Sequence, residues 1–428
     1  MSEVSPARLL TRSFILLSLA DLAYFTAGGM LLGTTPIFAS RVLDADTVGV
    51  GVAMGSFSLT TLVLRPWVGR AADRRGVKPV MLAGAAAFAV LTVGHFLVDD
   101  LLGLTLLRLL LGAAEALFFV AGFAALAHLA PQGRAGEALS LNSLALFAGL
   151  AAGPPVAQWA SEAHGLGLVW VAVAGLCGVA AVLVALLPRV GPTVAPGAPA
   201  TPLIHRPSLR PGVALLAGMV VSSAFLGFAG LYAQQLSIQA WSLVLGTYGA
   251  TVVICRVALA KVPDRVGPRR LAALALGLQA VALMGLWAIR HPAGLFGAAA
   301  VVGVGVALLT PAVFAEVMGH LPPGETGAAA ATTSMFIDVG LSAGPVLLGL
   351  LAAGAGLPGA FLLLTLLPLA GMVSLRRPGR AGGRSRPSRG RREQLPWRMS
   401  AWRARRARGR TRGASRRGRG PRWPNPRR

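Results

Sequence analysis

Long runs of apolar residues, separated by short polar stretches, recur along the whole chain. A helix that spans a membrane needs about 20 mostly apolar residues, and twelve runs come close to that length. They cover residues 13–38, 48–68, 79–98, 101–129, 138–160, 166–188, 211–235, 240–262, 271–289, 293–319, 328–351 and 357–375. Six runs precede the Pro- and Gly-rich stretch 189–210 and six follow it. The pattern predicts an all-α membrane protein with twelve transmembrane helices.

The two groups of six spans repeat each other at a constant offset, since Arg256 lies 191 positions after Arg65. The same step joins the pairs Asp73–Asp264, Arg74–Arg265, Gly76–Gly267, Gly112–Gly303, Gly149–Gly340, Gly153–Gly344 and Pro154–Pro345. An even number of spans per copy makes both copies cross the membrane in the same sense, so we expect parallel repeats with a substrate site between them. The expected organisation is a six-helix bundle at 1–188, a cytoplasmic linker at 189–210, a second six-helix bundle at 211–376 and a disordered tail at 377–428.

Composition and charge agree with a lipid environment and predict the orientation. The chain is 55% hydrophobic and 13% charged, and its mean hydropathy is +0.67, values typical of a helical membrane bundle. Basic residues in the short loops fall on one side of the twelve-span arrangement, and this side is the cytoplasm by the positive-inside rule. They include Arg8, Arg12, Arg74, Arg134, Arg189, Arg210, Lys261, Arg269 and Arg376. We expect a multi-pass protein of the cell membrane, namely a bacterial inner membrane, with both termini in the cytoplasm.

Residues 377–428 carry most of the chain's net charge of +25. Arginines interspersed with Gly, Pro and Ser cannot bury enough apolar surface to fold. Such a tail can contact anionic lipid head groups. The alternative, which we favour, is a dispensable extension. No specific nucleic-acid partner is expected.

The loop after the second span reads Gly-Arg-Ala-Ala-Asp-Arg-Arg-Gly-Val-Lys over residues 69–78, and a shorter copy reads Asp-Arg-Val-Gly over 264–267. This loop and its repeat resemble the signature of the major facilitator superfamily, although Ala71 and Val77 depart from it. The resemblance covers residues 10 to 376 and implies a fold of two six-helix bundles. It also implies that the loop latches the cytoplasmic side at the start of the eleventh span. The implied gate residues are Gly69, Asp73, Arg74, Gly76, Lys78, Asp264, Arg265 and Gly267.

Two further segments resemble proton-coupled members of that family. Arg108 and Gly112 are similar to an Arg-x-x-x-Gly pattern in the fourth span, and Gly149, Gly153 and Pro154 to the Gly/Pro segment of the antiporters' fifth span. Glycines four apart let helices pack closely, and a proline bends a helix. Because Gly340, Gly344 and Pro345 repeat the segment in the eleventh span, general helix packing is the alternative interpretation.

Four ionisable residues inside predicted spans have no counterpart in the other copy. They are Asp21, Arg108, Glu115 and Asp338, which map onto Gly212, Ala299, Val306 and Phe147. A charge in a span is costly and is expected to face a cavity or a partner. Arg108 and Glu115 are two helical turns apart on one face, so we expect both to project into the same aqueous path. We expect Glu115, or failing that Asp338 or Asp21, to carry a coupling proton. Mutually paired structural charges are the alternative. The repeated Arg65 and Arg256 are interpreted as interfacial anchors, with substrate contact as the alternative.

Polar residues expected to meet a substrate are Tyr24, Asn142, Gln234 and Gln235, and Glu316 is expected to pair with Arg265 or Arg269. The sequence has no phosphate-binding loop, metal-ligand spacing or nucleophile motif, so we expect neither an enzyme nor a cofactor. The predicted function is secondary active transport of a small organic solute, as a monomeric proton-driven exporter. The alternatives are an uptake symporter or uniporter for a small anion, favoured by Arg108, and a membrane receptor or anchor that recruits a partner through the basic tail.

Overall fold

A computed structural model describes residues 11–129, 135–188, 205–259, 266–319 and 326–376. The chain divides into two units, Met1–Arg377 and Pro378–Arg428. The first unit contains all the described helices. The predicted linker 189–210, up to residue 204, and the predicted tail 377–428 lie outside the described residues.

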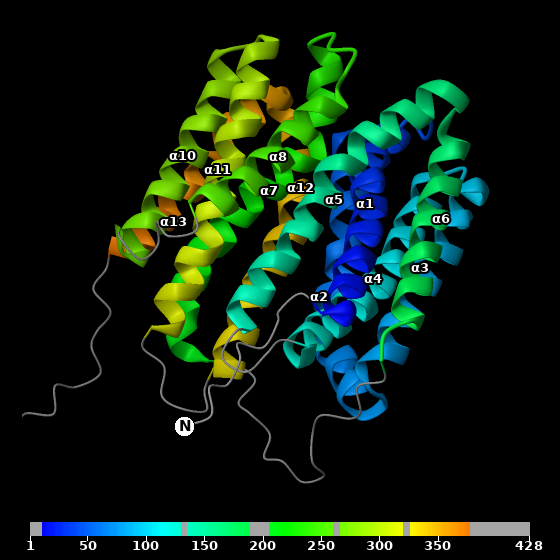
Figure 1. Cartoon of the computed structure of the whole chain (residues 1–428). Helices are drawn as coiled ribbons and strands as arrows, with labels where there is room; N and C mark the ends of the chain where they lie inside the picture. The colour runs from blue at the N-terminus through cyan, green and yellow to red at the C-terminus, as the bar shows by residue number, and fades with distance from the viewer. Residues whose placement is uncertain (1–10, 130–134, 189–204, 260–265, 320–325, 377–428) are drawn as a thin grey trace, which may run out of the picture. The chain divides into compact units, whose positions relative to one another are not determined.

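Helices account for nearly all of the described chain (Figure 1). The first half contains α1 (Arg12–Arg41), α2 (Thr47–Arg75), α3 (Val77–Val93) with the short η1 (Gly94–Leu97), α4 (Leu101–Leu129), α5 (Ala135–His164) and α6 (Leu166–Ala185). The second half contains η2 (Arg206–Ser208), α7 (Leu209–Gln235), α8 (Ser242–Ala258), α10 (Pro268–Ala288), α11 (Pro292–Met318), α12 (Thr326–Leu364) and α13 (Leu366–Arg376). In Figure 1, α5 and α12 lie between the two groups of helices.

The helix boundaries follow the predicted spans closely. Nine segments of the described chain are long and apolar enough to cross a membrane. The helix α8 has only 17 residues. The predicted eleventh and twelfth spans, 328–351 and 357–375, lie on either side of Gly356, whose non-helical φ of 66° and ψ of 170° divide the run labelled α12 into two helices. Length and hydropathy therefore support a multi-span bundle without reproducing the count of twelve.

The repeat is visible in the backbone as well as in the sequence. All four glycines with positive φ in the described chain fall into two pairs at the repeat offset, Gly76 with Gly267 and Gly165 with Gly356. Gly76 has φ 86° and ψ 154°, and Gly267 has φ 85° and ψ 137°. Glycine adopts this region without the steric cost that a Cβ brings. Both copies thus make the same turns with the same residue.

Side-chain caps define the two ends of the bundle. Asp46 accepts a hydrogen bond from Gly49 N (2.7 Å) where α2 begins, and Asp100 accepts one from Gly103 N (2.6 Å) where α4 begins. A carboxylate at this position satisfies free amide groups and the helix dipole. We call the end that carries Asp46 and Asp100 the capped end. The opposite end, where α1 begins at Arg12 and α2 ends at Arg75, is called the basic end.

Glycines bring the helices of each half together in matched pairs. In the first half, Gly149 and Gly153 of α5 press against the backbone of α1, where a Cβ at Gly149 would lie 2.7 Å from Thr26 N. In the second half, Gly340 and Gly344 of α12 press against α7, where a Cβ at Gly340 would lie 2.6 Å from Met219 Cβ. Small residues permit this approach in membrane bundles. The pairs α1–α5 and α7–α12 are therefore equivalent.

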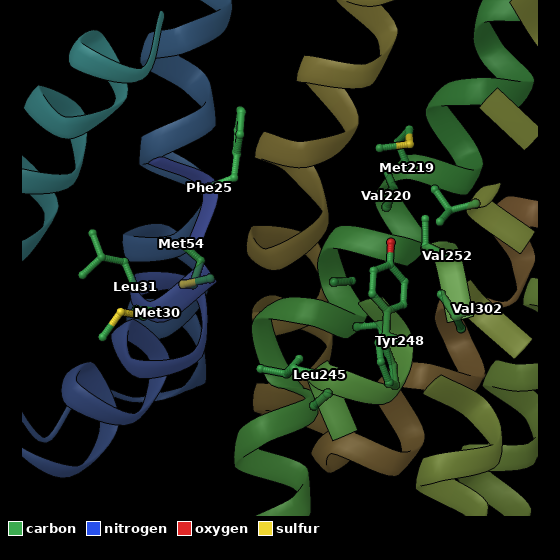
Figure 2. Close-up of a cluster of buried hydrophobic side chains, with 14 of the residues drawn as sticks. Phe25, Met30, Leu31, Met54, Met219, Val220, Leu245, Tyr248, Val252 and Val302 are labelled. Atoms are coloured by element: carbon green, nitrogen blue, oxygen red, sulfur yellow. The ribbon is translucent and has the colours of Figure 1, made fainter. Parts of the chain in front are cut away.

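Proline and glycine shape other matched contacts. Pro154 of α5 lies beside Gly33 of α1, and Pro345 of α12 lies beside Gly227 of α7. Gly112 of α4 abuts Phe57 O of α2, and the equivalent Gly303 of α11 would place a Cβ 2.9 Å from Tyr248 O of α8. The apolar core contains residues of both halves, such as Met30 and Met54 of the first and Tyr248 and Val302 of the second (Figure 2).

The two halves are joined by hydrogen bonds near the capped end. Thr47 Oγ1 donates to Gly349 O (3.0 Å), and Ser342 Oγ donates to Gly55 O (3.1 Å). On the other side of the interface, Gln158 Nε2 donates to Gln239 O (2.7 Å). The helix pairs that form this interface are α2–α12 and α5–α8, which are equivalent in the repeat. The halves are therefore packed tightly at the capped end.

Candidate functional site

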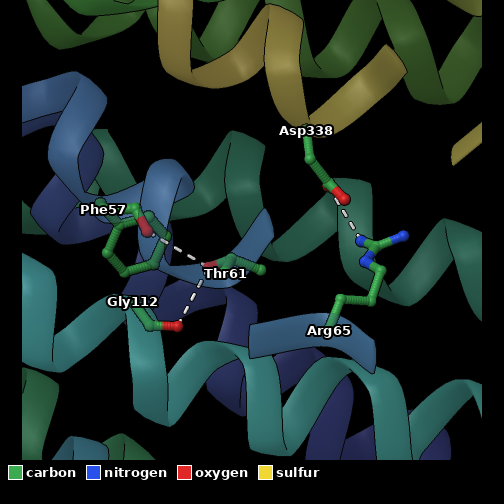
Figure 3. Close-up of polar contacts among 5 residues, drawn as sticks. All are labelled: Phe57, Thr61, Arg65, Gly112 and Asp338. Carbon is green, nitrogen blue, oxygen red and sulfur yellow. Dashed lines mark hydrogen bonds and ion pairs between the residues drawn. The ribbon is translucent and has the colours of Figure 1, made fainter. Parts of the chain in front are cut away.

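An ion pair joins the halves at a position farther from the capped end. Arg65 Nη2 of α2 lies 2.9 Å from Asp338 Oδ1 of α12 (Figure 3), and the two side chains are 22% and 6% exposed. Arg65 is thus not the interfacial anchor expected from its place near the end of a span. It turns toward the other half because Asp338 offers a carboxylate there. Asp338 has no equivalent acid in the first half. Its partner Arg65, in contrast, has an equivalent arginine in the second half, Arg256.

This ion pair uses only part of the hydrogen-bonding capacity of its two groups. Arg65 Nε and Asp338 Oδ2 are both buried, and neither has a hydrogen-bond partner in the described part of the chain. A buried ion pair stabilises a protein only when the remaining polar atoms are also satisfied. The contact therefore leaves one buried donor of Arg65 and one buried acceptor of Asp338 unsatisfied among the described residues.

The repeat-equivalent arginine makes a different contact. The guanidinium carbon of Arg256 in α8 lies 4.4 Å from the centroid of the Phe147 ring in α5, and Phe147 is the residue that occupies the position of Asp338 in the first copy. Arg256 Nε is buried without a partner among the described residues. Arg256 is therefore also not a simple anchor. At matched positions the interface has an ion pair on one side and a cation–π contact on the other.

Arg108 is held within its own half. Only 4% of the residue is exposed, Nε donates to Ala53 O at 3.3 Å, and its guanidinium carbon lies 4.4 Å from the centroid of the Phe57 ring. The close approach of α4 to α2 at Gly112 places Phe57 beside it, and Thr61 Oγ1 lies 3.0 Å from Gly112 O in the same contact (Figure 3). The structure therefore does not place Arg108 in an open aqueous path, contrary to our expectation.

Glu115 lies at the centre of the charged residues. It is half-buried on α4 and close enough to Asp21, Arg65 and Arg108 to interact with each electrostatically. Arg65 is thus near two acids, Glu115 in its own half and Asp338 in the other. The structure brings all four predicted ionisable residues to one region of the bundle.

Asp21 forms a polar chain with two neighbouring side chains. Asn142 Nδ2 of α5 donates to Asp21 Oδ2 at 2.6 Å, and Ser18 Oγ donates to Asn142 Oδ1 at 3.0 Å. A small, partly open recess with a volume of about 10 Å³ lies against this pair. Its other lining residues include Phe25, Phe118, Phe119 and Phe123. A predicted coupling acid and a predicted substrate contact therefore share one aromatic recess.

The other predicted substrate contacts separate into two places. Tyr24 is fully buried, and its ring stacks on Phe118 with centroids 3.7 Å apart. Its hydroxyl, which has no geometric hydrogen-bond partner in the described chain, lies near Glu115. Gln234 and Gln235 end α7 at the capped end, so they are not part of the charged region.

The predicted gate residues occupy varied environments. Gly69 has open space where a Cβ would stand, so the described conformation does not use it for close helix approach. Asp73 is half-buried and Arg74 is exposed, and no hydrogen bond links Asp73 to another described residue. Asp264 and Arg265 lie outside the described residues. The latch expected at the start of α12 stays a prediction.

Two basic residues of this region have defined partners. Lys78 Nζ donates to Ala185 O and Leu187 O, both at 2.7 Å, and so caps the end of α6 within its own half. Arg269 Nε lies 2.6 Å from Glu316 Oε1, which joins α10 to α11. The pairing of Glu316 with Arg269 is one of the two that we expected.

Sequence reasoning did not identify Arg65 and Arg256 as interface residues. The signal was present, because the offset that maps Arg65 onto Arg256 also maps Phe147 onto Asp338. What the sequence does not contain is the pairing of α2 with α12 and of α5 with α8. Only the packing of the two halves shows that these two mappings describe one repeated contact.

Comparisons with known proteins agree with this architecture. The family model of the Major Facilitator Superfamily matches residues 17–262 and 212–414. An uncharacterized MFS-type transporter of Salmonella typhimurium is 28% identical over 360 residues, which cover 80% of this chain and 90% of the relative. Another such transporter, from Burkholderia pseudomallei, is 28% identical over 370 residues, which cover 83% and 89%.

Solved structures with a similar fold belong to transporters of different solutes. The nucleoside transporter NupG has a TM-score of 0.68 at 15% identity and covers 86% of this chain and 100% of its own. The human organic anion transporter MFSD10 has a TM-score of 0.66 at 17% identity and covers 85% and 99%. With these matches and the family model, the described helices are those of a membrane transporter and not of an enzyme, and the chain belongs to the Major Facilitator Superfamily.

Proposed function

We propose that the protein is a proton-driven exporter of a small organic solute that works by alternating access between its two halves. The observation that carries this proposal is the incomplete ion pair of Arg65 and Asp338 between the halves. A proton on Asp338 removes its charge and with it most of the attraction to Arg65. Protonation is thereby linked to the contact between the halves.

Glu115 gives Arg65 a second acid to interact with. It lies in the same half as Arg65 and within its electrostatic reach. When a proton neutralises one acid, Arg65 is drawn toward the other. In our proposal Glu115 and Asp338 carry the coupling proton in turn. Asp21, which is hydrogen-bonded to Asn142, contributes a further ionisable group to the aromatic recess that both residues line. No cofactor takes part, and the proton gradient supplies the energy.

The orientation of the bundle follows from its charges. Arg12, Arg75 and Lys78 lie at the basic end, which we assign to the cytoplasm by the positive-inside rule. Since the halves are packed together at the capped end, the described conformation is closed toward the outside. The latch of Asp73 is then expected to form in the opposite conformation. We place the protein in a bacterial inner membrane as a monomer, with its arginine-rich tail against anionic lipids or dispensable.

Uptake of a small anion by symport or uniport is the second candidate function. Arg108 no longer favours it, because this arginine is packed against Phe57 and Ala53. Arg256, whose Nε has no hydrogen-bond partner among the described residues, is now the observation in favour of an anionic substrate. Flux measured in right-side-out and inverted vesicles separates export from uptake.

The test of proton coupling uses purified protein in proteoliposomes. A thermal-shift screen against metabolites and drugs at two pH values supplies the solute, and its flux is then followed under an imposed pH gradient. We expect Glu115→Gln and Asp338→Asn to lose the dependence on the gradient and to retain exchange of solute for solute. If both variants keep the full gradient dependence of the unaltered protein, the assignment of the coupling proton is wrong.

A further inference from the structure

The two halves present equivalent arginines to each other with unequal partners. The repeat maps Arg65 onto Arg256 and Phe147 onto Asp338, and the structure shows that both mappings belong to one contact. Arg65 meets Asp338 across α2–α12. Arg256 meets Phe147 across α5–α8. The α5–α8 contact therefore has an arginine equivalent to Arg65 but has no carboxylate equivalent to that of Asp338.

Arg256 is consequently a cation with no anionic partner among the described residues. None of the ion pairs in the described chain includes it, and its Nε is buried with no partner. The aromatic groups around it are Phe147 from α5 and Tyr248 from its own helix. A cation–π contact is weaker than a hydrogen-bonded ion pair, so burying this charge is only partly compensated.

Arg256 lies between the two halves, away from the capped end. It lies two residues before the end of α8 at Ala258, toward the basic end, and it is half-buried at the interface of the halves. The halves are packed together at the other end of α8, where Ser242 N donates to Gln158 Oε1 at 2.9 Å. Substrates of parallel-repeat transporters bind between the repeats.

We propose that Arg256 binds the carboxylate of a small organic anion. This carboxylate pairs with Arg256 as the carboxylate of Asp338 pairs with Arg65. Phe147 lies against the guanidinium and fixes its plane. In the ligand-bound protein, Nε, which is buried without a partner among the described residues, and one Nη present two parallel donors to the two carboxylate oxygens. This inference rests on the proposed transport function and names the substrate class, a monocarboxylate.

Ligand binding to the purified full-length chain in detergent tests the inference without any ion gradient. The probes are acetate and benzoate, with acetamide and benzamide as uncharged molecules of matching shape, and the readouts are thermal stabilisation and the dissociation constant. We expect a carboxylate to stabilise the unaltered protein more than its amide does. Arg256→Gln should weaken carboxylate binding by at least about tenfold, whereas Arg290→Gln, an exposed arginine at the capped end, should leave it unchanged.

A second variant copies the other side of the interface. Phe147→Asp places beside Arg256 the carboxylate that Arg65 already has, and it should abolish the preference for carboxylates without lowering the melting temperature. Equal stabilisation by carboxylates and amides in the unaltered protein would overturn the proposal. So would carboxylate binding that survives Arg256→Gln or Phe147→Asp. Because no gradient is applied, a failure of proton coupling in proteoliposomes leaves this result standing, and a failure here leaves the coupling assignment standing.

Discussion

The first and second halves of the protein share a backbone and differ in their charges. Gly76 and Gly165 make turns that Gly267 and Gly356 repeat, and the α5 glycines that contact α1 have equivalents in α12 that contact α7. The acids Asp21, Glu115 and Asp338 each occur in one copy only. Packing requires small residues at the same positions in both halves, whereas a transport cycle requires a directional arrangement of charge. The backbone turns and glycine contacts are therefore alike in the two halves, whereas the buried acids are not.

The largest effect is expected from breaking the ion pair that distinguishes α2–α12 from α5–α8. Asp338→Leu leaves Arg65 without its carboxylate, at a cost of up to about 3 kcal/mol, the lower part of the range for buried pairs because Arg65 is partly exposed. Thermal unfolding in detergent measures it. The double variant Arg65→Leu/Asp338→Leu should recover most of the loss. A double variant as unstable as the sum of its single variants would show that the pair does not act as a unit.

A somewhat smaller effect is expected at Asn142, the partner of Asp21. Asn142→Ala removes a hydrogen bond to a carboxylate (2.6 Å), and such bonds contribute about 1.5–3 kcal/mol. The melting temperature should fall. The matched variant Asp21→Asn/Asn142→Asp exchanges donor and acceptor and should restore much of the stability. Without this recovery, the contact has no specific role in holding α1 to α5.

Glycine substitutions test whether the two halves are equally packed. Gly149→Ala and Gly340→Ala each place a Cβ against a neighbouring helix, and overpacking of this kind costs about 1–3 kcal/mol. We expect similar losses of melting temperature in both halves. Gly69→Ala is the control, since open space surrounds that position. A large loss for one half and none for the other would contradict the equivalence of α1–α5 and α7–α12.

A modest effect is expected at Lys78, which has an acceptor pair at the end of α6. Lys78→Met keeps most of the side-chain length and removes the charge that caps Ala185 O and Leu187 O. Favourable charges at helix ends contribute about 0.3–1 kcal/mol, so the melting temperature should fall slightly. Lys78→Arg should retain the capping. An unchanged melting temperature for Lys78→Met would show that capping of α6 by this lysine does not stabilise the protein. The predicted role of Lys78 in the gate would then be the remaining explanation for it.

The smallest effect is expected from the arginine-rich tail. Deletion of residues 378–428 removes the second unit of the chain and leaves every described helix intact. Solute flux per molecule in proteoliposomes of neutral lipid should not change. Proteoliposomes with anionic lipid provide the comparison, because a loss of flux there alone would show that the tail acts through lipid head groups.

The sequence was sufficient for the helices and the repeat, because both leave periodic signals along the chain. The predicted span 101–129 coincides with α4, and the expected pairing of Glu316 with Arg269 is present. The gap between the predicted spans 328–351 and 357–375 contains Gly356, where the backbone leaves the helical region and the run labelled α12 divides.

The site was harder to predict because its contacts join distant parts of the chain. Asp338 was identified as a candidate because a charged side chain inside a membrane span is energetically costly. Its partner Arg65 was interpreted as an interfacial anchor because it lies near the end of its span. Arg108 was expected in an aqueous path, and Phe57 and Ala53 enclose it instead. A side chain's partner depends on which helices are neighbours, and hydrophobic patterns do not record neighbours.

The turn glycines have a mechanical consequence. Only Gly76 separates α2 from α3, and only Gly165 separates α5 from α6. A one-residue joint has little slack, so a tilt of α2 or α5 carries the adjoining helix with it. In the proposed alternating-access cycle, α3 is therefore expected to move with α2, and α6 with α5, so that each half moves as one body.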